Sequence, residues 1–152
     1  MTNIKTVKED RSLLSVVILG TLTFGIYELW YIHRLSKDVN IMCEEYGKKT
    51  PGIVPYIFLS LLTLGGYRVF WWFRVADMIS YVGNKRDVKM SLSPSFVMLS
   101  LILGYFVWGI ASWVAYHGVF QGANALAEDY NRKFRTKSYL DAQRKAEAEQ
   151  VC

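Results

Sequence analysis

The stretch TFGIYELWYIHR, residues 23–34, decides the fold, and it returns 40 residues later as TLGGYRVFWWFR, residues 63–74. Threonine, glycine, tyrosine and arginine coincide in the two copies, and an aromatic pair keeps the same register. The motif positions are Thr23, Gly25, Tyr27, Trp30 and Arg34 in the first copy and Thr63, Gly65, Tyr67, Trp71 and Arg74 in the second. A fainter third copy, WGIASWVAYHGVFQGAN, starts at Trp108 with an offset of 84 and keeps Gly109, Ile110, His117 and Asn124.

Each copy predicts the end of an apolar helix at a membrane surface. Glycine in an apolar helix permits a bend or a close helix contact. The tyrosine and tryptophan that follow prefer the head-group zone, and the arginine behind them reaches water. The unit therefore indicates an apolar helix, a flexion point, an aromatic collar and a basic exit.

Three windows of 21 to 25 residues, 12–32, 52–73 and 92–116, are almost free of charge in a chain that is 52% hydrophobic. About 20 helical residues cross the ~30 Å hydrocarbon core of a bilayer. Helices of a soluble bundle need a polar stripe on the solvent side, and these windows have none. We therefore predict an all-α membrane protein with three hydrophobic transmembrane helices, multi-pass in the cell (inner) membrane.

The polar segments complete a single membrane domain, 1–152. Residues 1–11 form a polar lead, and 121–150 predict a polar amphipathic tail helix with favourable i, i+4 charge pairs. Its short apolar stripe of Leu126, Tyr130 and Phe134 has three alternative placements: on the bilayer surface, on the core, or against a partner helix. The basic residues beside it favour the bilayer surface.

The distribution of lysine and arginine does not orient three straight spans. With that topology, seven of these basic residues near the membrane fall on one side and eight on the other. That difference is too small for the positive-inside rule. Three alternatives stay open: straight spans oriented by other means, insertion in both directions, and re-entrant helical hairpins that keep every basic flank on the cytoplasmic side. The lengths of the windows favour straight spans.

Glu28 and Arg68 are the only charged residues inside the windows, and they occupy the same repeat position with opposite sign. We single them out as a candidate intramembrane ion pair, because a charge there is costly. In consecutive straight spans they would lie about 15 Å apart. In parallel hairpins they would share a depth and meet. The alternative is that each side chain snorkels separately to the interface.

No pattern for catalysis or for a cofactor is present. Metalloprotease, nucleophile-elbow and phosphate-loop motifs are missing from the sequence. His33 and His117 share a repeat position but form too thin a ligand set for a metal, and Cys43 and Cys152 show no metal-ligand spacing. The net charge of +5 is spread among acids, which argues against nucleic acid and favours a bilayer with anionic head groups.

The pattern T-x-G-I-Y-x-x-W of residues 23–30, followed by a basic residue and by Asp38-x-Asn40, resembles domain-of-unknown-function family 4234 of small prokaryotic membrane proteins. The resemblance covers roughly Arg11 to Asn131. It implies a bacterial or archaeal cell membrane and supplies no activity or site residue.

Two functions follow as hypotheses. The first is a non-enzymatic membrane protein that acts by self-association or by binding another membrane component. The second is a small transporter or pore-forming subunit that uses Glu28 and Arg68.

Overall fold

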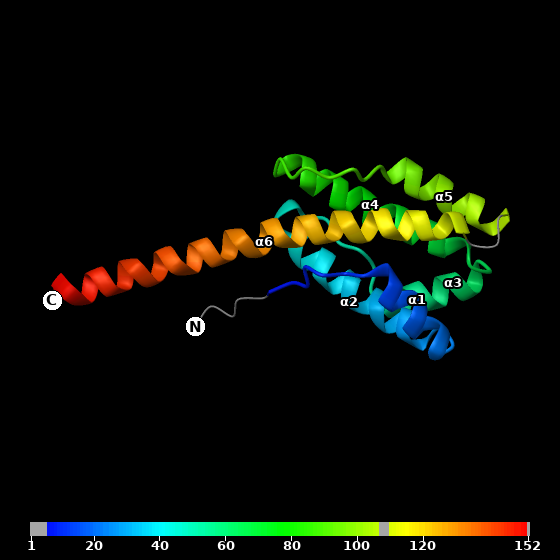
Figure 1. Ribbon diagram of the computed structural model, residues 1–152, viewed down its shortest axis with the longest axis horizontal. Helices are drawn as coiled ribbons and strands as arrows, with labels where there is room; N and C mark the ends of the chain where they lie inside the picture. Colours follow the sequence, from blue (N-terminus) through cyan, green and yellow to red (C-terminus); the bar gives the residue numbers. More distant parts are fainter. Residues whose placement is uncertain (1–5, 107–109, 152) are drawn as a thin grey trace.

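The computed structural model describes residues 6–106 and 110–151, in which all regular secondary structure is helical. The main helices follow one another in three pairs (Figure 1). They are α1 (Leu13–Leu22), α2 (Ile26–Cys43), α3 (Ile53–Leu62), α4 (Gly66–Lys85), α5 (Pro94–Phe106) and α6 (Ile110–Val151), with a short 3-10 helix at Glu44–Tyr46. The predicted all-α fold class is confirmed.

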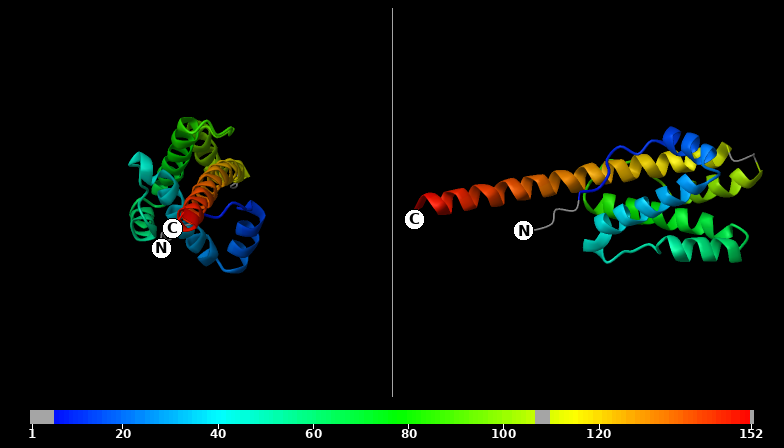
Figure 2. Two further views of the ribbon diagram at one scale, coloured as in Figure 1. Left: turned by 90° about the vertical axis from the view of Figure 1, so that its left-hand side faces the viewer. Right: turned by 90° about the horizontal axis from the view of Figure 1, so that it is seen from below.

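The prediction of one straight helix across each apolar window is wrong. A turn at 23–25 divides the first window between α1 and α2, and a turn at 63–65 divides the second between α3 and α4. The third window is shared by α5 and α6. The second helix of each pair runs back beside the first, so that the chain forms three helical hairpins with their tips at one end, away from the C-terminal end of α6 (Figures 1 and 2).

The division leaves helices of two kinds. α1 and α3 are apolar but have 10 residues each, about 15 Å of helix. α2 and α4 are longer but carry charged residues along their length. Among the helices of the described residues, none is both long enough and apolar enough to cross a membrane.

Glycine allows the chain to reverse at the first two tips. Gly25 has a φ of 88° and Gly65 a φ of 91°, in the left-handed region where a Cβ is penalised. The N–H of Gly25 donates to the carbonyl of Gly20 at 2.8 Å, which closes the end of α1. The corresponding bond from Gly65 to Ser60 is 2.7 Å long. The glycine of the motif therefore ends a helix, where the sequence had indicated only a flexion point.

The motif threonine joins the two helices of a hairpin. The Thr23 hydroxyl donates to the carbonyl of Leu19 at 2.7 Å and accepts the N–H of Tyr27 at 2.9 Å. Thr63 makes the same two bonds at the same distances. The hydroxyl thus adds a second bond to a carbonyl that already accepts the N–H of the same threonine at 3.0 Å. It also satisfies an N–H at the start of the second helix, a group that helix starts leave open.

The inner helices α2, α4 and α6 share one register and form the core. They begin at Ile26, Gly66 and Ile110, the positions that offsets of 40 and 84 assign. Corresponding residues on them are buried in all three. These sets are Tyr31, Trp71 and Ala115; Leu35, Val75 and Val119; Ser36, Ala76 and Phe120; Val39, Ile79 and Ala123; and Met42, Val82 and Leu126. The repeat itself therefore places the core between the three inner helices.

The outer helices close a ring around the inner three. α1 contacts α2 and α6, α3 contacts α4 and α2, and α5 contacts α6 and α4. Each outer helix therefore lies between its own hairpin partner and the inner helix of the neighbouring hairpin. The arrangement is a pseudo-threefold ring, seen along its length in the left view of Figure 2.

Polar residues at one repeat position hold the segments that lead into the next hairpin. The side chain of Asn40 accepts the N–H of Thr50, just before α3, at 2.7 Å. The hydroxyl of Ser80 donates to the carbonyl of Leu92, just before α5, at 2.8 Å. Asn40 and Ser80 are separated by the 40-residue offset of the repeat.

The third residue of this set, Asn124, closes the ring. It accepts the N–H of Arg11, before α1, at 2.9 Å and donates to the carbonyl of Arg11 at 3.1 Å. Two turns further along α6, Asn131 exchanges bonds of 3.1 and 2.8 Å with the backbone of Val7. The polar lead is therefore fixed along α6.

The predicted tail helix, 121–150, is the continuation of α6 and has no separate start. Leu126 and Tyr130 are buried and Phe134 is half-buried, so their stripe packs on the core, which is the second of the three alternatives. The bilayer surface, which the sequence favours, is not where it lies. From Arg135 to Arg144 every residue is exposed, and the helix extends past the bundle (Figure 1).

Candidate functional site

The structure brings Glu28 and Arg68 together. Each is the third residue of an inner helix, α2 or α4, and the parallel hairpins place both at the same distance from the tips. Arg68 Nη2 donates to Glu28 Oε1 at 2.5 Å. The hydroxyl groups of Tyr56 and Tyr116 also lie within hydrogen-bonding reach of Arg68. The pair predicted for the hairpin alternative is present, whereas straight antiparallel helices would have separated it.

A cavity of about 620 Å³ lies beside this pair. Its walls come from α1, α2, α4, α5 and α6, and both Glu28 and Arg68 line it. Ser112, which the 84-residue offset places in register with Glu28, lines it as well. All three copies of one repeat position therefore meet at this cavity.

The tips carry an apolar surface, which we name the tip surface. Phe24 is 98% exposed and Leu64 is 94% exposed, although both belong to turns with left-handed backbone. Further large exposed side chains surround them near the ends of the helices. The tip surface comprises Leu22, Phe24, Ile26, Leu61, Leu62, Leu64 and Phe106. Such an apolar patch marks a surface that contacts protein or lipid.

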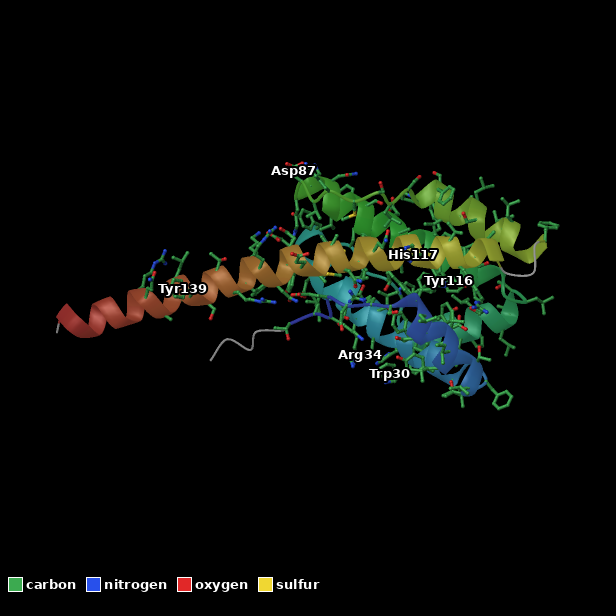
Figure 3. All side chains as sticks on the ribbon, in the orientation of Figure 1. Trp30, Arg34, Asp87, Tyr116, His117 and Tyr139 are labelled. Carbon is green, nitrogen blue, oxygen red and sulfur yellow. The ribbon has the colours of Figure 1, made fainter. Side chains whose placement is uncertain are left out.

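Only one residue of each aromatic pair in the predicted collar is exposed. Trp30 and Phe70 are exposed at corresponding positions, while their neighbours Tyr31 and Trp71 are buried in the core. The guanidinium of Arg34 lies over the ring of Trp30, 5.2 Å from its centroid, on the outer side of α2 (Figure 3). The motif tryptophan of the second copy, Trp71, is thus a core residue. Arg74 is exposed and donates to the carbonyl of Lys49 at 3.2 Å.

Charged residues gather at the end opposite the tips. Arg86 pairs with Glu45 at 3.0 Å and with Asp129 at 3.6 Å, joining the ends of the first two hairpins to α6. Nearer the lead, Arg11 pairs with Asp38 at 2.7 Å, and both side chains are largely buried. Ion pairs other than Glu28–Arg68 therefore lie toward the end opposite the tip surface.

Sequence reasoning missed the role of Arg11, Asp38 and Asn124. One signal was present, because Asn40 and Asn124 align in the repeat and Asp38 belongs to the Asp-x-Asn ending. Their partners, however, are far away in the sequence: Asn124 binds Arg11 across 113 residues. No local pattern indicates such a pairing.

The two histidines do not form a common site with acidic or thiol groups. His33 is half-buried and His117 is exposed on α6 (Figure 3). Within residues 6–106 and 110–151, no three His, Cys, Asp or Glu side chains are grouped so that they could hold a metal ion. Cys43 is fully buried, and burial raises the pKa of its thiol to about 12.

Comparison with known proteins yields one match. The family model described as Domain of unknown function (DUF4234) matches residues 11–55 and 51–122, which together span all three hairpins up to the first third of α6. The two matches overlap at residues 51–55, where the second hairpin begins. No curated protein and no solved structure matches the chain.

Proposed function

Because the chain belongs to the DUF4234 family, whose description assigns no activity, we propose its function from geometry. The protein is a non-enzymatic membrane protein anchored in one leaflet by three hairpin tips. It acts by association, either with itself or with another membrane component. Its place is the cell (inner) membrane, with the ionic end toward the cytoplasm.

The tip surface is the observation that carries this proposal. Its seven large apolar side chains are exposed at one end of the molecule, where water would contact them. Moving one such side chain from water into hydrocarbon is worth about 1.5–3 kcal/mol, so the seven together supply on the order of 10 kcal/mol. That is enough to hold the hairpins in a bilayer.

The dimensions of the hairpins suit half of a bilayer. α1 and α3 have 10 residues each, about 15 Å of helix, against a hydrocarbon core of ~30 Å. Arg34, eight residues after the start of α2, then lies about 12 Å from the tip, from where its long side chain reaches the head groups. Hairpins also resolve the near-equal distribution of lysine and arginine, seven on one side and eight on the other, that straight spans would give. In hairpins every basic flank falls on the same side of the membrane.

Reactivity of engineered cysteines tests this topology. In a cysteine-free background, single cysteines replace Lys8, Lys49, Lys89 or Lys137, one in each polar segment, or Leu64 at a tip. We expect all four polar positions to react with an impermeant maleimide from the cytoplasmic face only, and the tip to be protected from both faces. Labelling of Lys49→Cys and Lys89→Cys from opposite faces would restore straight spans and refute the hairpin anchor.

The exposed part of α6 supports action by association. It projects past the body with Tyr139 and Leu140 exposed. Every residue from Arg135 to Arg144 is exposed, so this part of the helix presents both apolar side chains to a partner. We expect crosslinking through Leu140→Cys in native membranes to trap a defined dimer or a defined complex, and crosslinking through Lys49→Cys to trap much less. A product that is monomeric at every position would refute association.

The transporter subunit is a second candidate, favoured by the position of Glu28 and Arg68 on a cavity wall. If it is correct, replacing both by glutamine abolishes solute or ion flux in reconstituted vesicles. Vesicles with the native chain that show no flux above protein-free vesicles would eliminate it.

A further inference from the structure

The cavity beside Glu28 and Arg68 lies at a position where the first hairpin has a smaller side chain than the second. Tyr56 of α3 is 3% exposed, and its ring packs against Trp71 with centroids 5.2 Å apart. The corresponding residue of α1 is Val16, which leaves that space open and lines the cavity. One turn along α1, a Cβ on Gly20 would meet nothing within 4 Å. No residue of α1 is buried, so this helix covers the cavity without filling it.

The cavity combines an apolar wall with several polar side chains, which include Tyr31 and Ser112. Leu101, Trp113 and Phe120 contribute to the apolar part, and its volume falls within the range of small-molecule sites. Its charged lining residues are the Glu28–Arg68 pair, whose side chains are 33% and 42% exposed. The pair offers a hydrogen-bond acceptor beside a donor and has no net charge.

We propose that this cavity binds one neutral, single-chain amphiphile with a hydroxyl head group, such as a monoacylglycerol. The hydrocarbon chain lies along the apolar wall between α1 and α6. A head-group hydroxyl donates to the carboxylate of Glu28, and a second oxygen accepts from the guanidinium of Arg68. The bilayer in which the proposed anchor lies would supply such a molecule, so the inference rests on the proposed function for its source of ligand.

The electrostatics select a neutral head group. A carboxylate or an ammonium head would add an unbalanced charge to a site in which the two existing charges already compensate each other. A charge buried away from water without a partner is strongly disfavoured. A plain alkane, in turn, would leave the exposed oxygens and nitrogens of the pair without a new partner.

Native mass spectrometry of the full-length chain tests the proposal with three probes of equal chain length. They are monopalmitoylglycerol, palmitate and hexadecyltrimethylammonium, and each is added to protein released from nanodiscs and to protein in a non-ionic detergent. We expect one monopalmitoylglycerol per chain, with an affinity about tenfold higher than that of either charged probe, as hydrogen bonds to charged groups imply. Equal retention of the three probes would overturn the proposal.

Two matched variants locate the site. Val16→Tyr introduces the side chain that the second hairpin has at the equivalent position, Tyr56. We expect this variant to lower retention of monopalmitoylglycerol about tenfold. Leu14→Tyr adds the same ring to the same helix at an exposed position that does not line the cavity, and retention should stay native. Both variants must keep the native helical circular dichroism. If they bind alike, the cavity is not the site.

A third variant tests the head-group contact. Glu28→Gln leaves Arg68 without its counter-charge, so the preference should move from monopalmitoylglycerol to palmitate. An unchanged order of the probes would refute the role given to the pair. Mass spectrometry counts the bound probes on protein that is outside a membrane, so its result does not depend on topology. A failed maleimide experiment would therefore refute the hairpin anchor alone, and a failed binding experiment would refute the proposed ligand alone.

Discussion

Replacing Asn124 by alanine should open the ring of hairpins at its closing contact. The side chain of Asn124 makes two hydrogen bonds to the backbone of Arg11, at 2.9 and 3.1 Å. Arg11 is 7% exposed, so water does not readily replace the lost partner. A buried backbone group left without a partner costs about 1–3 kcal/mol, and two such groups with partial relaxation cost about 2–4 kcal/mol.

The assay is reversible thermal unfolding in a mild detergent, followed by near-ultraviolet circular dichroism of the core tryptophans. For a chain of this size the loss corresponds to a fall in Tm of roughly 5–15 °C. Gln121→Ala, on an exposed position one turn earlier in α6, is the control and should unfold at the native temperature. If Asn124→Ala also unfolded at the native temperature, the lead would not be clamped to α6 and the ring would be open.

Three further predictions concern the turn, the ion pair and the buried thiol. Gly25→Ala should lower the free energy of unfolding by about 1–2 kcal/mol, because its φ of 88° penalises a Cβ even where space is free, whereas Gly20→Ala should not. A double-mutant cycle on Glu28 and Arg68 in a bilayer should give a coupling free energy larger than the about 0.2–1 kcal/mol of ion pairs exposed to water, because lipid does not screen the two charges. A smaller coupling free energy would contradict the placement of this pair in the membrane. In a background without the other cysteine, Cys43 should resist iodoacetamide at pH 8 until the chain is denatured, because burial raises its pKa to about 12 and removes the thiolate; rapid labelling of the folded protein would contradict this.

The repeat shows how far local pattern led toward the fold. The offset between Thr23 and Thr63 predicted equivalent units, and α2 and α4 start at equivalent residues. The same pattern did not distinguish a bend from a reversal, because glycine permits both. The bond from the Thr23 hydroxyl to the carbonyl four residues earlier also occurs in uninterrupted helices. The length of the apolar window then favoured a straight span, and that choice was wrong.

The candidate site divides in the same way. In the sequence, Glu28 and Arg68 are opposite charges at one repeat position, and only parallel hairpins would bring them into contact. Their contact was therefore conditional on topology. The cavity beside them was not foreseen. Val16 lines it where the second hairpin has Tyr56, and the importance of that difference appears only once α1 and α3 are placed around the core.

The sequence by itself determined that the chain is helical, that it repeats one unit, and that its apolar windows contain two charged residues, Glu28 and Arg68. These properties depend on neighbouring residues and on short-range periodicity. Only the tertiary structure decided that the chain turns back at each tip, that α6 holds the lead of α1 through Asn124, and that one hairpin leaves a cavity. Those features depend on which distant surfaces pack together, and the free energy of that packing is a property of the whole ring.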